Sequence, residues 1–257
     1  MRKLILTTSF LIALFISGNL LAQVHVGVKG SFDLVKMNLK VEGKKVENPE
    51  SYKFKPAFNA GIFAEFSIAD EFYFRPELLF SSKGIIYHKV QDLSLDTKAE
   101  YTDKTTLNYL ELPVYFVYKH DLSSGNIMLG VGPYFAYGLN GKVKQETVIT
   151  RSSANPQTTL STRETLVEFE NNLEFDNDYD LNRFLFQYVG LPMSRKHFKR
   201  FDVGASIMAG YEFSSKLSAL VVAQFGLTDI TPKANGNKIN SNTKHIGFGI
   251  SLGYRIF

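Results

Sequence analysis

The chain has 257 residues, of which 44% are hydrophobic, and it carries a formal net charge of +4. This size and composition suit one large all-β domain or two small domains. The sequence contains no cysteine, which excludes a disulfide framework and a lipid-bearing cysteine behind a signal peptide.

The first 22 residues have the pattern of a secretory signal peptide. Arg2 and Lys3 precede a mostly apolar run over residues 4–16, and we expect cleavage after Ala22. The run is shorter than the roughly 20 residues that span a bilayer, which argues against an uncleaved anchor. The remaining domain, residues 23–257, keeps 27 of the 29 basic residues against 25 acidic ones. This small excess gives no support to a nucleic-acid partner.

Eight later segments alternate between apolar and small or polar residues. In the last of them, Phe248 and Ile250 stand at even positions, and Gly247 and Ser251 stand at odd positions. A period of two is typical of a β-strand with two unlike faces. No stretch after the signal peptide is apolar over the length of a transmembrane helix, so this chain would have to enter a membrane by strands. The segments are residues 24–34, 58–68, 72–83, 106–119, 127–139, 201–213, 217–228 and 244–257.

The lengths of the segments and of their links favour a barrel. Each segment reaches the roughly nine to eleven residues that a tilted strand needs to cross a bilayer, and short and long links alternate. One face carries large apolar residues that suit lipid, and the other is rich in Gly and Ser with single charges that suit a narrow lumen.

The sequence therefore predicts an all-β fold, an eight-stranded antiparallel up-and-down transmembrane β-barrel in the outer membrane. Its long loops would lie outside and both termini would lie in the periplasm. The alternative, a soluble sandwich or lipocalin-like barrel, would turn its large apolar side chains inward and its charges to water, and is less favoured.

These segments, above all "RPELLFSSKG" (75–84) and "LNYLELPVYF" (107–116), resemble those of PorT-type outer-membrane β-barrel proteins. The resemblance covers nearly all eight strands and says little about residues 141–200. It implies a barrel in the outer membrane. The family label comes from one member linked to protein secretion, so it does not establish that role here, and it provides no catalytic residues to transfer.

Four charged residues on the inward faces are candidates for a polar network. Glu65 and Arg75 stand about equally far from the tight link between the second and third segments, so they can pair across the strands, with Glu77 and Glu111 extending the network. Such a network can form a polar path or ligand site. The favoured interpretation is a salt-bridged filling of a lumen too narrow for a water channel.

The long outer loop, residues 141–200, contains two strand-like segments at 142–150 and 158–170 that would make ten strands if they joined the barrel. Their charges, from Lys142 to Glu170, leave no continuous lipid-facing belt. Lys or Arg at the bilayer midplane costs about 2–4 kcal/mol. We therefore expect an extended hairpin that projects outward.

The run "DNDYD" at residues 176–180 places carboxylates at alternating positions, as at the start of a calcium-binding EF-hand loop. Leu181 stands where that motif requires Gly, and Gln187 stands where it requires Glu. A solvated acidic loop is the better interpretation.

A basic run, "RKHFKR" at residues 195–200, enters the sixth strand from the outer side. It either contacts the phosphates of outer-leaflet glycolipid or is a solvated charge run. Before it, "FLFQYVGLPM" (184–193) is apolar enough to bind a partner, although packing within its own loop is favoured. The possible glycolipid contacts are Arg195, Lys196, Lys199 and Arg200.

The five histidines lie far apart and none belongs to a local acyl-transfer or metal signature. His25 and His245 would approach each other if the first and last strands close the barrel, but neither has a placed Ser or carboxylate partner. We therefore expect no enzyme activity, no cofactor and no metal.

The sequence predicts a non-enzymatic outer-membrane protein whose surface loops bind a ligand or protein, or shield the surface. A small pore and a lipid-modifying enzyme are the alternatives. The expected partners are outer-membrane lipid, an unknown loop ligand and the barrel assembly machinery, since the terminal Phe257 resembles the assembly signal of such barrels. An interfacial anchor is the alternative role for this aromatic residue.

Overall fold

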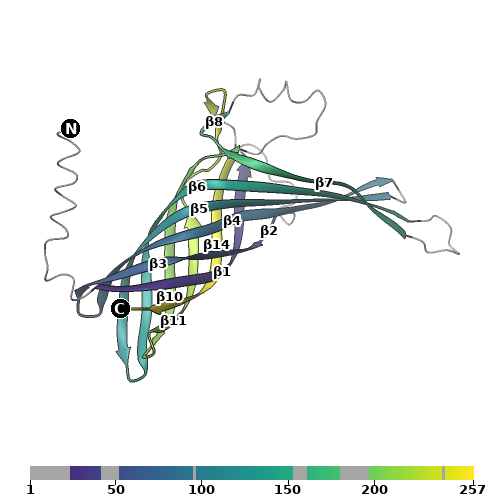
Figure 1. The fold of residues 1–257 in the computed structure, drawn as a ribbon. Coiled ribbons are helices and arrows are strands. Elements are labelled where there is room, and N and C mark those ends of the chain that lie inside the picture. Colours follow the sequence, from purple (N-terminus) through teal and green to yellow (C-terminus); the bar gives the residue numbers. More distant parts are fainter. Residues whose placement is uncertain (1–23, 42–51, 95–96, 153–160, 180–196, 239–240) are drawn as a thin grey trace.

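The computed structural model describes residues 24–41, 52–94, 97–152, 161–179, 197–238 and 241–257. Eight antiparallel strands form a closed ring (Figure 1). The ring closes because the strand at residues 201–213 pairs with the strand at residues 125–152, and the last strand, residues 241–255, pairs with the first, residues 24–41. The predicted all-β eight-stranded barrel is confirmed. The strands are β1 (Val24–Val41), β3 (Lys55–Ala69), β4 (Phe72–Ser94), β5 (Thr97–Leu122), β6 (Gly125–Ser152), β10 (Phe201–Phe213), β11 (Leu217–Gly226) and β14 (Ser241–Arg255).

Three short turns join β3 to β4, β5 to β6 and β10 to β11, all at one end of the barrel. Glu71 and Lys216 adopt positive φ angles of 65° and 69° in two of these turns. The C-terminal strand ends nearby, where the Ile256 amide donates to the Val26 carbonyl at 2.8 Å. The described chain therefore begins and ends at the short-turn end, and the longer connections lie at the opposite, long-loop end.

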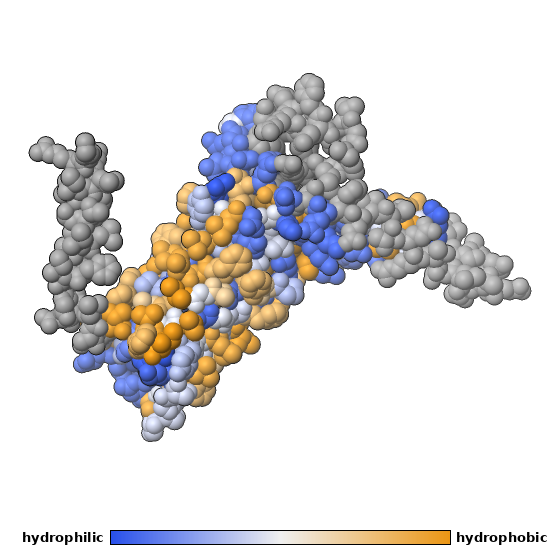
Figure 2. Space-filling view, in the orientation of Figure 1, coloured by the Kyte–Doolittle hydropathy of each residue, from blue (hydrophilic) through white to orange (hydrophobic). Residues whose placement is uncertain are grey.

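Alternate residues of each strand face out of the barrel, and these are mostly large and apolar. Phe32, Ile62, Phe116, Val131 and Ile250 are each at least half exposed. Figure 2 shows an apolar band on the visible face of the barrel, with hydrophilic residues toward the long-loop end. This surface fits a lipid environment. No helix in the described part of the chain is long and apolar enough to cross a membrane.

Three strands continue well past the ring and form a protruding sheet with β7 (Ser161–Phe175). β4 pairs with β5 as far as Ser94, and β7 pairs with β6 from Gly141 to Ser152. The extension points away from the barrel in Figure 1. The two charged segments of the 141–200 region thus form a hairpin outside the ring of eight strands, as predicted.

Five shorter strands complete the long-loop end. β9 pairs with the end of β7, and β12 pairs with β8 and β13 in a small separate sheet. These strands are β2 (Tyr52–Lys53), β8 (Asp178–Tyr179), β9 (His197–Phe198), β12 (Lys233–Ala234) and β13 (Asn237–Lys238).

Spin labels should separate the two parts of β6. A label at Lys144→Cys, on the protruding part, should be accessible to a water-soluble nickel complex, because its charged neighbours exclude lipid. A label at Leu129→Cys, on the apolar belt, should be accessible to oxygen instead. The chain has no native cysteine, so each label is unique. Oxygen accessibility and nickel protection at position 144 would contradict an eight-stranded membrane span.

Candidate functional site

The first charged cluster in the lumen is built around Arg75. Arg75 Nη1 lies 2.9 Å from Glu65 Oε1, and Arg75 Nε lies 2.9 Å from Glu77 Oε1. Arg75 and Glu77 are two residues apart on β4, so strand alternation turns both inward, and β3 presents Glu65 to the same space. The guanidinium also lies over the ring of Phe63, 3.7 Å from its centre. Three of the four predicted network residues therefore meet as expected.

Lysines and a third acid extend this cluster. Lys29 Nζ lies 2.6 Å from Glu77 Oε2, and Lys119 Nζ lies 2.6 Å from Glu65 Oε2. Lys119 also contacts Glu212 at 2.9 Å, and Glu212 binds Arg255 at 3.1 Å. Sequence reasoning missed Lys119 and Glu212 as members, although their inward position in each alternating strand was a usable signal.

Glu111 does not extend this cluster, so that expectation is wrong. It faces Leu79, four residues along β4 from Arg75, which is about 13 Å at the usual rise of a strand. Its partners are Lys83 Nζ at 2.9 Å and Gln224 Nε2 at 2.5 Å. The register of β4 against β5 therefore places Glu111 in a second cluster.

The second cluster lies toward the long-loop end. Lys83 Nζ contacts Asp202 Oδ2 at 3.4 Å, and His245 Nδ1 lies 2.9 Å from the same oxygen. The Tyr134 hydroxyl donates to this carboxylate at 3.2 Å, and Lys83 Nζ lies 3.9 Å from the centre of the Tyr134 ring. Lys83 is thus held between two acids and an aromatic face, with almost no exposure.

The charges in the lumen nearly balance. In the described part of the chain, the lumen contains five lysine or arginine side chains and six carboxylates. His245 lies in the lumen as well. Buried charges are tolerated only when they are paired and hydrogen-bonded, and here each basic side chain contacts a carboxylate at 3.4 Å or less. The residues are Lys29, Arg75, Lys83, Lys119 and Arg255 with Asp33, Glu65, Glu77, Glu111, Asp202 and Glu212.

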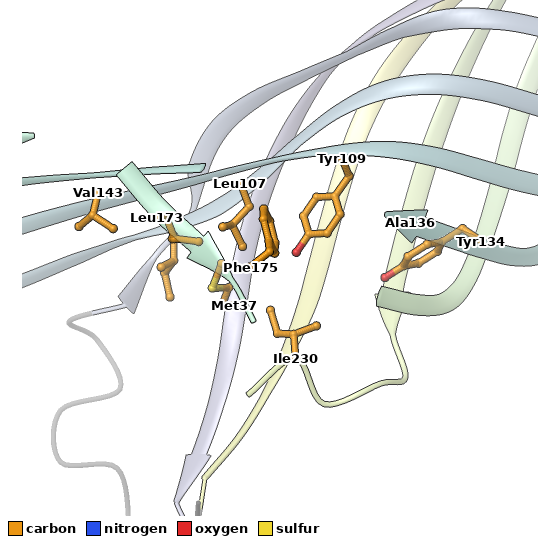
Figure 3. Packing of buried hydrophobic residues seen from close by; sticks show 10 residues of the cluster. Met37, Leu107, Tyr109, Tyr134, Ala136, Val143, Leu173, Phe175 and Ile230 are labelled. Carbon is orange, nitrogen blue, oxygen red and sulfur yellow. The ribbon is translucent and has the colours of Figure 1, made fainter. Parts of the chain in front are cut away.

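An apolar cap covers the lumen at the long-loop end (Figure 3). The end of β7 places Phe175 against Tyr109, with ring centres 5.6 Å apart. The Phe175 ring occupies the space beside Gly138, where a Cβ atom would lie 2.5 Å from it. Ile230, from the connection after β11, is fully buried in the same cluster. The cap therefore joins two segments that are far apart in the sequence.

The connection that carries Ile230 is held by Asp229. Its Oδ1 accepts hydrogen bonds from the amides of Thr231 at 3.0 Å and Thr243 at 2.9 Å. Burial alone would raise the pKa of the Asp229 carboxyl, but these two amides, the Thr231 side chain and the charge of Lys199 together hold the pKa below its ordinary value. An ionised Asp229 thus fixes Ile230 in the cap.

The family model described as "Outer membrane protein beta-barrel domain" matches residues 19–232. This chain belongs to that family. Among the solved structures that are similar to this outer-membrane barrel are three with low identity and low TM-scores. The attachment invasion locus protein Ail of Yersinia pestis is 10% identical, with 91% of this chain and 99% of that chain covered and a TM-score of 0.32.

For Neisserial surface protein A the identity is 11%, the shares covered are 90% of this chain and 97% of that chain, and the TM-score is 0.30. OprG from Pseudomonas aeruginosa is 11% identical, with 91% of this chain and 96% of that chain covered and a TM-score of 0.36. A search of curated proteins finds no match for this outer-membrane barrel.

The basic run of this outer-membrane barrel is only partly described. Arg195 and Lys196 lie outside the described residues, as does the apolar segment 184–193. Lys199 Nζ donates to the Asp229 carbonyl at 3.0 Å, and Arg200 donates to the Tyr137 hydroxyl at 3.0 Å. Lys199 and Arg200 thus contact their own chain, and the glycolipid contact stays a prediction for all four residues.

The acidic run is used differently from an EF-hand loop. Asp178 accepts the Gly236 amide with both carboxylate oxygens, at 2.9 and 3.0 Å. Asp176 lies 3.2 Å from His197 Nδ1. Asp180 and the rest of the compared loop lie outside the described residues.

His25 and His245 lie at opposite ends of the barrel, so their suggested approach is wrong. The register pairs His245 with Met37 near the cap, whereas His25 lies at the short-turn end, 3.5 Å from Arg255. Closure of β1 on β14 is antiparallel, so the start of one strand meets the end of the other.

Phe257 also lies at the short-turn end, with 75% of its surface exposed.

Proposed function

We propose that this outer-membrane barrel is a non-enzymatic protein that binds a surface ligand or protein through its long-loop end. The observation that supports it most is the contrast between its two parts. The lumen is filled by charges of which, among the residues that the structure describes, all but Asp33 are paired, and it is covered by the Phe175 and Ile230 cap, while β4 to β7 carry a sheet beyond the apolar belt (Figure 1). A binding role therefore suits the protruding sheet better than the lumen.

In this proposal the short-turn end, with both termini, faces the periplasm. Outer-membrane barrels combine short periplasmic turns with long outer loops, and the turns between β3 and β4 and between β5 and β6 are only two residues long. The protruding sheet would then stand on the cell surface, where extracellular partners are accessible.

Photocrosslinking on intact cells tests the role of the sheet. A photoreactive residue replacing Val90, which is 51% exposed on the extended part of β4, should give a cross-linked product with a surface macromolecule. The matched control replaces Ser215, an exposed residue of a short turn. The proposal fails if position 90 gives no product, or if both positions give the same one.

Conductance measurements test the alternative that the protein is a small pore. We expect no stable conductance steps in planar bilayers, because an eight-stranded barrel has a lumen just wide enough for its own side chains. Stepwise currents that scale with salt concentration would replace the binding proposal with a pore.

A lipid-modifying enzyme is the other alternative. His245 Nδ1 contacts Asp202, but within the described residues His245 Nε2 has no hydrogen-bond partner, so no serine hydroxyl is activated there. We therefore infer no acyl-transfer centre in the lumen. The loss of one lipid species from the outer membrane of a deletion strain would contradict this.

The resemblance to PorT-type barrels raises the question of a role in protein secretion but does not establish it. It rests on the segments 75–84 and 107–116, which form parts of β4 and β5. A deletion strain with an unchanged profile of secreted proteins would exclude that role.

A further inference from the structure

We propose that Glu174, Asp176 and His197 form a binding site for a divalent transition-metal ion at the long-loop rim. Each offers one ligand atom, and these atoms all lie within 4.8 Å of one another. The sequence did not predict this site, because His197 is separated from the two acids by more than 20 residues and belongs to no metal-binding motif.

Strand pairing brings the three side chains together. β7 and β9 pair in parallel, with Glu174 opposite His197 and Phe175 opposite Phe198. Side chains alternate along a strand, so Glu174 points away from the cap that Phe175 enters. Asp176, directly after the end of β7, places its carboxylate near that of Glu174. The same pairing thus supplies metal ligands on one side and apolar contacts on the other.

The base of the site is fixed by backbone and side-chain bonds. The Asp176 amide donates to the Phe198 carbonyl at 3.0 Å. Arg200 Nη2 donates to the Phe175 carbonyl at 3.3 Å. Phe175 is buried and Phe198 packs against the same cluster. Metal sites need ligands held on a rigid scaffold, and these contacts provide one.

The spacing of His197 and Asp176, and the chemistry of all three ligands, fit zinc or a related metal. His197 Nδ1 and Asp176 Oδ2 are 3.2 Å apart. Two ligands bound to zinc at about 2.0–2.1 Å in a tetrahedron are roughly 3.4 Å apart. An imidazole nitrogen with two carboxylates favours zinc and its neighbours over calcium, which prefers oxygen ligands alone. Water would complete the coordination, because all three side chains are only partly buried.

A metal here would act on the cap. The ion would connect β7 to β9 at the point where Phe175 turns into the barrel, so it would oppose separation of β7 from the rim. This inference does not depend on which partner the protruding sheet binds. Asp178 does not belong to this cluster, and both its carboxylate oxygens accept the Gly236 amide instead.

Isothermal titration calorimetry with ZnCl2 tests the site on the mature barrel in detergent, without a histidine tag. We expect one zinc ion per chain and a loss of at least about tenfold in affinity for His197→Ala and for the nearly isosteric Asp176→Asn. The control is His120→Ala, which removes another histidine paired with an acid, Glu71 at 2.8 Å, from the short-turn end. Its affinity should be unchanged.

Cobalt provides a second readout. Co2+ bound to the intact protein should give visible absorption bands that change on addition of zinc and are absent from Asp176→Asn. Gel mobility before and after boiling confirms that each variant is folded. The proposal is overturned if the wild type binds no zinc, if Asp176→Asn retains wild-type affinity, or if His120→Ala weakens binding as much as His197→Ala.

Discussion

Replacing Arg75 with methionine should lower the free energy of unfolding by about 3 kcal/mol or more. The substitution keeps much of the side-chain volume but leaves the Glu65 and Glu77 carboxylates without their shared cation in a space closed to water. Each acid keeps one lysine, Lys119 or Lys29. The expected loss therefore stands at the lower end of the range for breaking a buried ion pair, and the barrel should still fold.

The measurement is urea unfolding in lipid vesicles or detergent, followed by gel mobility and circular dichroism, because the chain has no tryptophan for fluorescence. A double variant, Arg75→Met with Glu65→Gln, should recover part of the loss, since it restores the balance of charge while Lys119 keeps Glu212 and Lys29 keeps Glu77.

The matched control is Lys142→Met. Lys142 Nζ lies 2.6 Å from Glu170 Oε1, as close as the buried pairs, but both side chains are more than half exposed on the protruding sheet. Water and salt screen such a pair, so the stability should not change measurably. Equal losses for Arg75→Met and Lys142→Met would show that the lumen cluster contributes no more than a surface pair.

Deleting Phe257 should sharply reduce the amount of protein in the outer membrane of cells while changing its refolding in detergent little. The residue adds one ring beyond the end of β14, and 75% of its surface is exposed. Loss of such a side chain should cost about 1 kcal/mol. If the residue is an assembly signal, as the resemblance to outer-membrane barrels implies, the defect will appear only when assembly machinery is required.

The control for this experiment is Phe213→Ala. Phe213 is a half-exposed aromatic residue at the end of β10, near the same interface, but it is not terminal. An interfacial anchor would predict similar effects of both changes, in cells and in detergent. Equal reductions for the two variants would therefore contradict the role of Phe257 as a signal.

The sequence by itself determined the strands and the two faces of the barrel. Burial on a strand follows a period of two, which is a local property, so Phe248 and Ile250 identify the lipid face without knowledge of any partner strand. The tight link between β3 and β4 also set the approximate register near it, and this was enough to bring Glu65 to Arg75.

Only the tertiary structure decided which inward residues meet across longer distances. The register of β4 against β5 places Glu111 in contact with Lys83 instead of Arg75. Ring closure placed Phe175 and Ile230 in one cap, and the pairing of β7 with β9 placed His197 beside Asp176. Alternation shows that a side chain points inward but not its height in the barrel, because height depends on the register of every strand pair and on the loops that return to the rim.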